Sequence, residues 1–85
     1  MTKIEWLLNH GYKPTDLTKR GFTQDYTKDS NYDYIQIIDL ERTDCFVSAY
    51  DDYPVFREKD AKDMLKVLEM AKKDYEQMIK ECEDV

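Results

Sequence analysis

The chain has 85 residues and a net charge of −6. Hydrophobic residues make up 41% of the sequence and aromatic residues 13%. A chain of this length forms one domain (residues 1–85) with a single modest core, and this apolar content excludes an intrinsically disordered protein. Its longest apolar runs are a few residues, whereas a helix needs about 20 to cross a bilayer. No apolar signal segment follows Met1, so we expect a cytoplasmic protein with no membrane contact.

Charge is divided unevenly along the chain. Residues 1–22 carry a net charge of +2, residues 23–53 carry −6 and residues 54–85 carry −2. Phosphate backbones require a basic surface, so the acidic middle third disfavours direct nucleic-acid binding and favours a basic protein partner. The basic residues of the segment 12–22 (Lys13, Lys19 and Arg20) leave a nucleic-acid contact there as a weaker alternative.

A capping-box pattern, Thr2 followed by Glu5, predicts the start of a short helix over about residues 3–10. Gly11 supplies a left-handed stop at its end. So short a helix is marginal in water unless one side docks on a larger element, and we expect Trp6 to take part in that docking.

The middle of the chain predicts an antiparallel meander of three strands. Pro14 excludes regular structure around it, so residues 12–20 are expected to form a loop. Strands are predicted at about residues 21–28, 32–40 and 45–50, because each segment is rich in aromatic and β-branched residues and the connections are short.

A long amphipathic helix is predicted over about residues 58–83. Its apolar residues recur at alternating spacings of three and four: Ala61, Met64, Leu68, Ala71, Tyr75, Met78 and Cys82. The predicted fold is therefore α+β with the order αβββα, in which the long helix lies across one face of the sheet.

The predicted helix is longer than the strands it covers. It spans about 39 Å, against about 23–30 Å for the strands, so its end should extend past the sheet. That end carries Met78, Ile79 and Cys82, which we interpret as a candidate contact with a second copy of the chain. An open sheet edge is the other candidate for a homodimer contact.

No motif predicts a metal site, a cofactor or a catalytic site. The Asp29-x-Asn31-x-Asp33 spacing resembles a calcium loop, but Tyr34 and Leu40 occupy the positions that require glycine and glutamate. The chain has one histidine, no nucleophile elbow and no glycine-rich phosphate loop, so we expect no enzyme activity. The two cysteines lack CxxC spacing and are expected to be free thiols.

Tyrosines and aspartates gather on the predicted strands and turns. Alternation along the second strand favours Ile35 and Ile37 facing the long helix, with Tyr32 and Tyr34 on the open face. On the third strand, Cys45 and the alternate residues Val47 and Ala49 suit the helix side. The candidate partner-binding residues are Asp25, Asp29, Tyr32, Asp33, Tyr34, Glu41, Asp44, Tyr50, Asp51, Asp52 and Tyr53. These residues fit either an ordinary half-exposed sheet or a face that contacts a basic partner.

Size, acidity and the αβββα layout are similar to those of small phage-encoded inhibitors of the anti-CRISPR and anti-restriction kind. This resemblance covers architecture and charge, and no site residue is carried over from it. It implies a non-enzymatic acidic protein that occupies a basic nucleic-acid-binding surface of a partner protein. The alternative is a small structural or regulatory subunit that acts as a homodimer through its long C-terminal helix.

Overall fold

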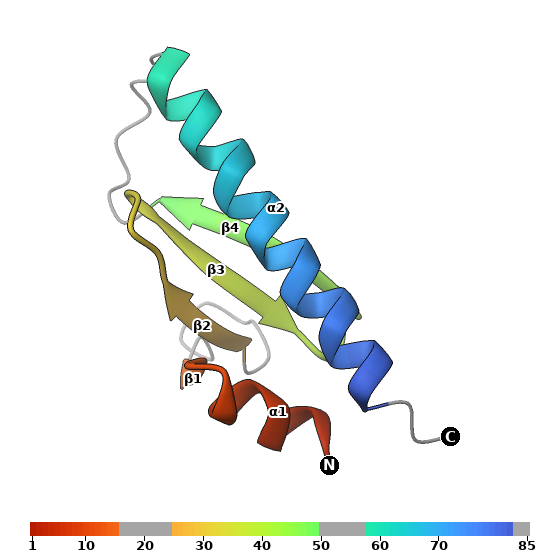
Figure 1. Cartoon of the computed structure of the whole chain (residues 1–85). Coiled ribbons are helices and arrows are strands. Elements are labelled where there is room, and N and C mark those ends of the chain that lie inside the picture. Colours follow the sequence, from red (N-terminus) through yellow and green to blue (C-terminus); the bar gives the residue numbers. More distant parts are fainter. Residues whose placement is uncertain (16–24, 50–57, 83–85) are drawn as a thin grey trace.

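The computed structural model describes residues 1–15, 25–49 and 58–82. A short helix, four strands and a long helix follow one another along the chain (Figure 1): α1 (Lys3–Asn9), β1 (Lys13–Thr15), β2 (Asp25–Asp29), β3 (Tyr34–Asp39), β4 (Asp44–Ala49) and α2 (Glu58–Glu81). The strands form one antiparallel sheet in the order β1-β2-β3-β4, and α2 crosses one face of it. The predicted α+β class is confirmed.

The sheet has four strands, where three were predicted. The additional strand, β1, lies in the segment that was expected to be a loop because of Pro14. The prediction was wrong because β1 is an edge strand, where the missing N–H of a proline need not interrupt the pairing. Pro14 pairs with Tyr26 of β2, and Thr15 donates or accepts a side-chain hydrogen bond with Thr27 at 2.7 Å.

Local chemistry fixes both ends of α1. The Thr2 hydroxyl accepts a hydrogen bond from the Glu5 amide at 3.1 Å, as the capping-box pattern predicts. Gly11 has a φ of 88°, and the amides of Gly11 and Tyr12 donate to the carbonyls of Leu8 (3.5 Å) and Leu7 (3.0 Å). This is a Schellman motif, which ends the helix and directs Tyr12 back toward the sheet.

The face of β3 that meets α2 is the opposite of the predicted one. The Tyr34 hydroxyl donates to the Asp60 carbonyl of α2, and Ile38 packs in one cluster with Met78. Alternation then places Ile35 and Ile37 on the other face of the sheet. Ile38 pairs with Cys45 of β4, so the two residues lie on the same face of the sheet. The prediction that Cys45 and its alternate residues on β4 face the helix is therefore correct.

The hydrophobic core lies where α1, the sheet and the C-terminal half of α2 meet. Trp6 and Leu7 of α1, both at most 1% exposed, lie in one cluster with Ile38 of β3, Met78 and Cys82. Docking of α1 through Trp6 is therefore confirmed. Met78 and Cys82 face this core, with Ile79 packed against it, because α1 covers the end of α2. Neither Met78 nor Cys82 presents a surface to a second copy.

Candidate binding surface

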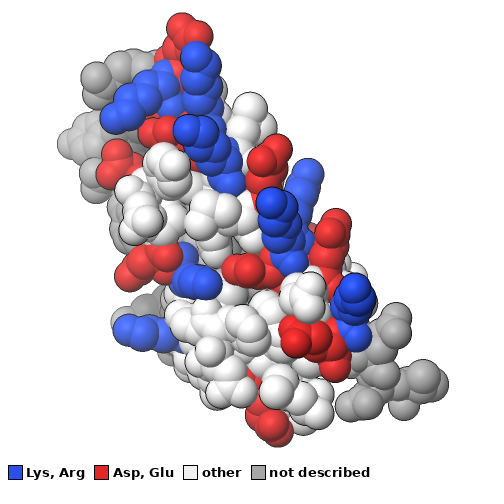
Figure 2. All heavy atoms as spheres, in the orientation of Figure 1, with Lys and Arg blue, Asp and Glu red and all other residues white. Residues whose placement is uncertain are grey.

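The negative charge lies in the sheet and its turns. Residues 25–49 contain six acidic and two basic residues, a net charge of −4, whereas α2 contains seven acidic residues and six lysines, a net charge of −1. Figure 2 shows that basic and acidic side chains alternate along the side of α2 that points away from the sheet. The α2 face therefore has mixed charge, and the acidic excess belongs to the strands and turns of the sheet.

Three aspartates form a row across β2, β3 and β4 on the sheet face opposite α2. Asp39 pairs with Asp44, and the register of Tyr26 with Ile38 places Asp25 beside Asp39 on the next strand. Asp25 and Asp39 are buried, whereas Asp44 is exposed. The row ends on β1 with Thr15, the residue that pairs with Asp25.

Asp25 and Asp39 differ in the groups that surround their carboxylates. One oxygen of Asp39 accepts from the Glu41 amide at 3.0 Å and the Arg42 amide at 3.1 Å, and the other lies 3.5 Å from Arg42 Nε. Burial raises the pKa of Asp25, and the charge of Asp39 and a hydrogen bond to it raise that pKa further. The fold therefore favours the protonated form of Asp25 more than the unfolded chain does.

Exposed carboxylates lie at the two ends of β3. Asp29 and Asp33 flank the β2–β3 connection, and Glu41 and Asp44 flank the β3–β4 connection. The first connection is shaped by Ser30, whose hydroxyl donates to the Tyr34 carbonyl at 2.7 Å and accepts from the Tyr32 amide at 3.1 Å. The second is capped by the Asp39 carboxylate described above. The sheet thus presents two fixed acidic turns.

The tyrosines do not form the predicted open face. Tyr34 is buried beneath α2 with its hydroxyl bonded to Asp60, so it cannot anchor a partner. Tyr32 is half-buried, and Lys66 of α2 lies 5.8 Å from its ring centroid. The remaining candidates, Tyr50, Asp51, Asp52 and Tyr53, lie outside the described residues. The described candidate surface therefore consists of carboxylates and, among the candidate tyrosines, only the partly exposed Tyr32.

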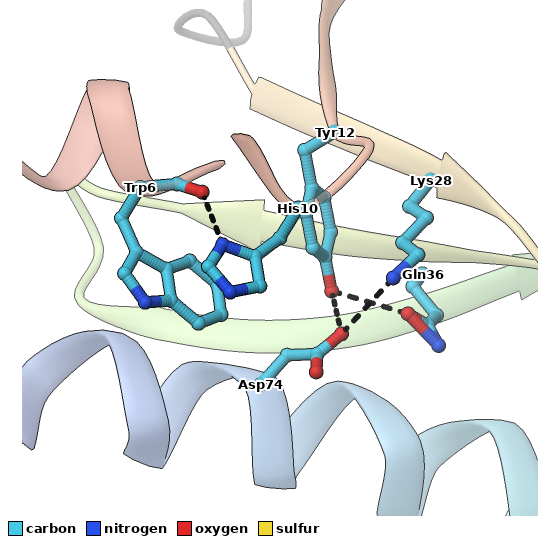
Figure 3. A network of polar contacts seen from close by, with 6 residues as sticks. All are labelled: Trp6, His10, Tyr12, Lys28, Gln36 and Asp74. Carbon is cyan, nitrogen blue, oxygen red and sulfur yellow. Dashed lines mark hydrogen bonds and ion pairs between the residues drawn. The ribbon is translucent and has the colours of Figure 1, made fainter. Parts of the chain in front are cut away.

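A polar network that the sequence did not predict joins the α1–β1 connection, β2 and β3 to α2 (Figure 3). The hydroxyl of the buried Tyr12 donates to Asp74 at 2.8 Å and lies 3.1 Å from the Gln36 amide oxygen. Lys28 lies 3.8 Å from the same Asp74 carboxylate and 5.5 Å from the Tyr12 ring centroid. Burial and the neighbouring Asp74 carboxylate raise the pKa of Tyr12, so its hydroxyl stays protonated and acts as a donor.

One feature of the sequence does point to this network. Asp74 lies three residues after Ala71 and four before Met78, so it is a charged residue on the buried side of α2. A carboxylate at such a position needs a donor, which Tyr12 and Lys28 supply. Beside the network, the His10 ring stacks on Trp6 with centroids 3.7 Å apart, and its Nδ1 lies 2.7 Å from the Trp6 carbonyl oxygen.

No family model, curated protein or solved structure matches the chain. Across residues 1–15, 25–49 and 58–82, no helix is long and apolar enough to cross a membrane. Within the same ranges, no group of three or more His, Cys, Asp or Glu side chains is placed to hold a metal ion. Cys45 and Cys82 both carry free thiols.

Proposed function

We propose that this protein is a non-enzymatic acidic binding protein whose two acidic turns contact a basic, nucleic-acid-binding surface of a partner protein. The partner class that fits is a DNA- or RNA-binding enzyme of the kind blocked by small phage-encoded inhibitors, with the carboxylates standing in for phosphates. The observation that carries the proposal is the set of four exposed carboxylates in the two turns (Asp29, Asp33, Glu41 and Asp44), whereas the acidic residues and lysines of α2 nearly balance at a net charge of −1.

The geometry of the acidic turns supports this proposal. Hydrogen bonds of Ser30 and Asp39 hold the two turns in place at opposite ends of β3. A strand of this length separates its ends by about 20 Å, so the turns present charge at two points of one rigid element. Fixed charges of one sign speed encounter with a surface of the opposite sign and weaken as salt screens them.

Displacement of labelled duplex DNA tests the proposal. A type I restriction endonuclease and an RNA-guided CRISPR nuclease would each be loaded with the duplex, and fluorescence anisotropy would follow its release as this protein is added. We expect release at low salt and its loss between roughly 0.05 and 0.5 M NaCl, since surface charges are largely screened over that range.

Two charge-reversal variants separate the turns from overall charge. Asp33→Lys with Asp44→Lys changes one carboxylate in each turn, and we expect at least about tenfold weaker displacement, which corresponds to about 1.4 kcal/mol. The control, Glu69→Lys with Glu76→Lys, makes the same change of net charge on exposed positions of α2. Equal losses in both variants, or no displacement from either enzyme, would reject the acidic turns as the contact surface.

A further inference from the structure

The two edges of the sheet differ in their protection against further strand pairing. At one edge, β1 has 3 residues and contains both Lys13 and Pro14, which are features that discourage an edge strand from pairing. At the other edge, β4 has 6 residues, with the sequence DCFVSA, and contains no lysine, proline or glycine. No strand of the described ranges lies on the outer side of β4. The β4 edge is therefore the one chemically suited to accept another strand.

The helix adds an apolar flank beside this edge. Tyr75 of α2 lies close to Thr43 and Cys45, so the side of α2 that carries Tyr75 is the side nearest β4. Leu68 lies two turns before Tyr75 on that side, and Leu65 follows further round the helix toward solvent. Leu68 is half-buried and Leu65 is 56% exposed. An open strand edge and an exposed leucine thus lie on the same flank of the molecule.

We propose that β4 pairs antiparallel with β4 of a second copy, forming a two-fold symmetric dimer with one continuous sheet. Such a contact is closed, because the same surface is used by both copies. Asp44, at the start of β4, is the strand's one charged residue. Antiparallel pairing sends the two Asp44 carboxylates to opposite ends of the new ladder, whereas parallel pairing would bring these like charges together.

The position of α2 favours a second copy over an isolated strand from another protein. Because α2 contacts both β3 and β4, its axis lies over the outer half of the sheet (Figure 1). With strands about 4.8 Å apart, a two-fold axis at the β4 edge brings the two α2 helices to roughly 10 Å, a distance at which helices pack side by side. A second copy therefore covers Leu65 and Leu68 as well as the strand edge, while an added strand alone leaves Leu65 exposed.

Sedimentation equilibrium over a dilution series of the full chain tests the dimer. We expect a mass of about twice the 10.2 kDa of the chain at high concentration. Leu65→Lys should raise the dimer dissociation constant at least about tenfold, while leaving the circular dichroism spectrum of the monomer unchanged because the side chain is already exposed. Leu8→Lys is the matched control, since Leu8 is 52% exposed on α1, away from this flank.

Amide hydrogen exchange tests whether β4 itself pairs. Amides of β4 that face outward should exchange more slowly as the concentration rises through the dimer dissociation constant, whereas β1 amides should not change. A mass of 10.2 kDa across the whole series, a dimer lost in Leu8→Lys but kept in Leu65→Lys, or a dimer with unchanged β4 exchange would each overturn the proposal. This inference does not depend on the acidic turns, so Asp33→Lys, which lies outside β4, should remain dimeric.

Discussion

The hydroxyl of Tyr12 donates to the carboxylate of Asp74 at 2.8 Å, although the two residues are 62 positions apart in the chain. Tyr12 follows the Schellman motif that ends α1, and Asp74 lies in the C-terminal half of α2. The bond therefore ties the first element of the fold to the last across the sheet. Lys28 of β2 approaches the same carboxylate, so one partly buried charge connects three segments.

Removal of this bond should destabilise the protein. Tyr12→Phe keeps the ring in place but leaves Asp74 with one donor fewer, and we expect a loss of about 1–2 kcal/mol in the free energy of unfolding, measured by urea denaturation. In a double-mutant cycle with Asp74→Asn, the coupling should be about 1 kcal/mol. If the two losses add with no coupling, the hydroxyl and the carboxylate do not interact in solution.

Replacement of Gly11 by a residue that disfavours a positive φ should lower the stability of the protein. A Cβ added at Gly11 would meet Lys28 Cε at 3.6 Å, an ordinary van der Waals contact, so the cost of Gly11→Ala comes from its φ of 88°. We expect about 1 kcal/mol of destabilisation for alanine and less for asparagine, which adopts this conformation more readily. Thermal unfolding of the two variants measures this difference, and equal melting temperatures would contradict the assignment to backbone conformation.

Two methionines of α2 should respond very differently to truncation. Met78 is fully buried against α1 and β3, so Met78→Ala should cost about 2–5 kcal/mol through lost burial and a cavity. Met70→Ala, at a position that is 41% exposed, is the control and should stay within about 0.5 kcal/mol of the parent. If Met78→Ala were only mildly destabilising but abolished a dimer, the end of α2 would instead be a contact between two copies of the chain.

The features that the sequence predicted correctly are those that local chemistry decides. Thr2 and Gly11 mark the ends of α1 through hydrogen bonds and backbone conformation within a few residues, and the apolar spacing of α2 identifies the helix without knowledge of its neighbours. The acidic residues of the turns could also be placed, because a turn at Ser30 follows from residue type.

The features that failed depend on contacts between distant segments. Ile35 and Ile37 compete with Ile38 and Leu40 for the buried side of β3, and alternation alone cannot choose between two faces with two apolar residues each. The choice is made by the register with β4 and by α1, which packs onto Ile38. Tyr34 was consequently predicted on the wrong face of the sheet, where it had been a candidate contact for a partner protein.

The Asp25–Asp39 pair should make stability depend on pH. The folded-state pKa of Asp25 is raised above its unfolded value of 3.8, so the protonated form is the one that folding favours. The stability it contributes is fully present below pH 3.8 and is lost as the pH rises through the folded-state pKa. Asp25→Asn should therefore be more stable than the parent at neutral pH, by about 1 kcal/mol, because the amide is uncharged and can donate to Asp39.

Glu81 should contribute the opposite dependence, which allows the two groups to be separated. The Trp6 indole donates to its carboxylate and lowers the pKa of Glu81, so this stabilisation is present above the unfolded-state pKa and is lost as the pH falls through the folded-state value. Urea denaturation from acid to neutral pH should show that Glu81→Gln flattens the loss of stability at acid pH, whereas Asp25→Asn removes the loss of stability that Asp25 causes as the pH rises toward neutral. Glu69→Gln, on the exposed side of α2, is the control and should leave the profile unchanged. An Asp25→Asn profile parallel to that of the parent would mean that Asp25 does not carry the proton of this pair.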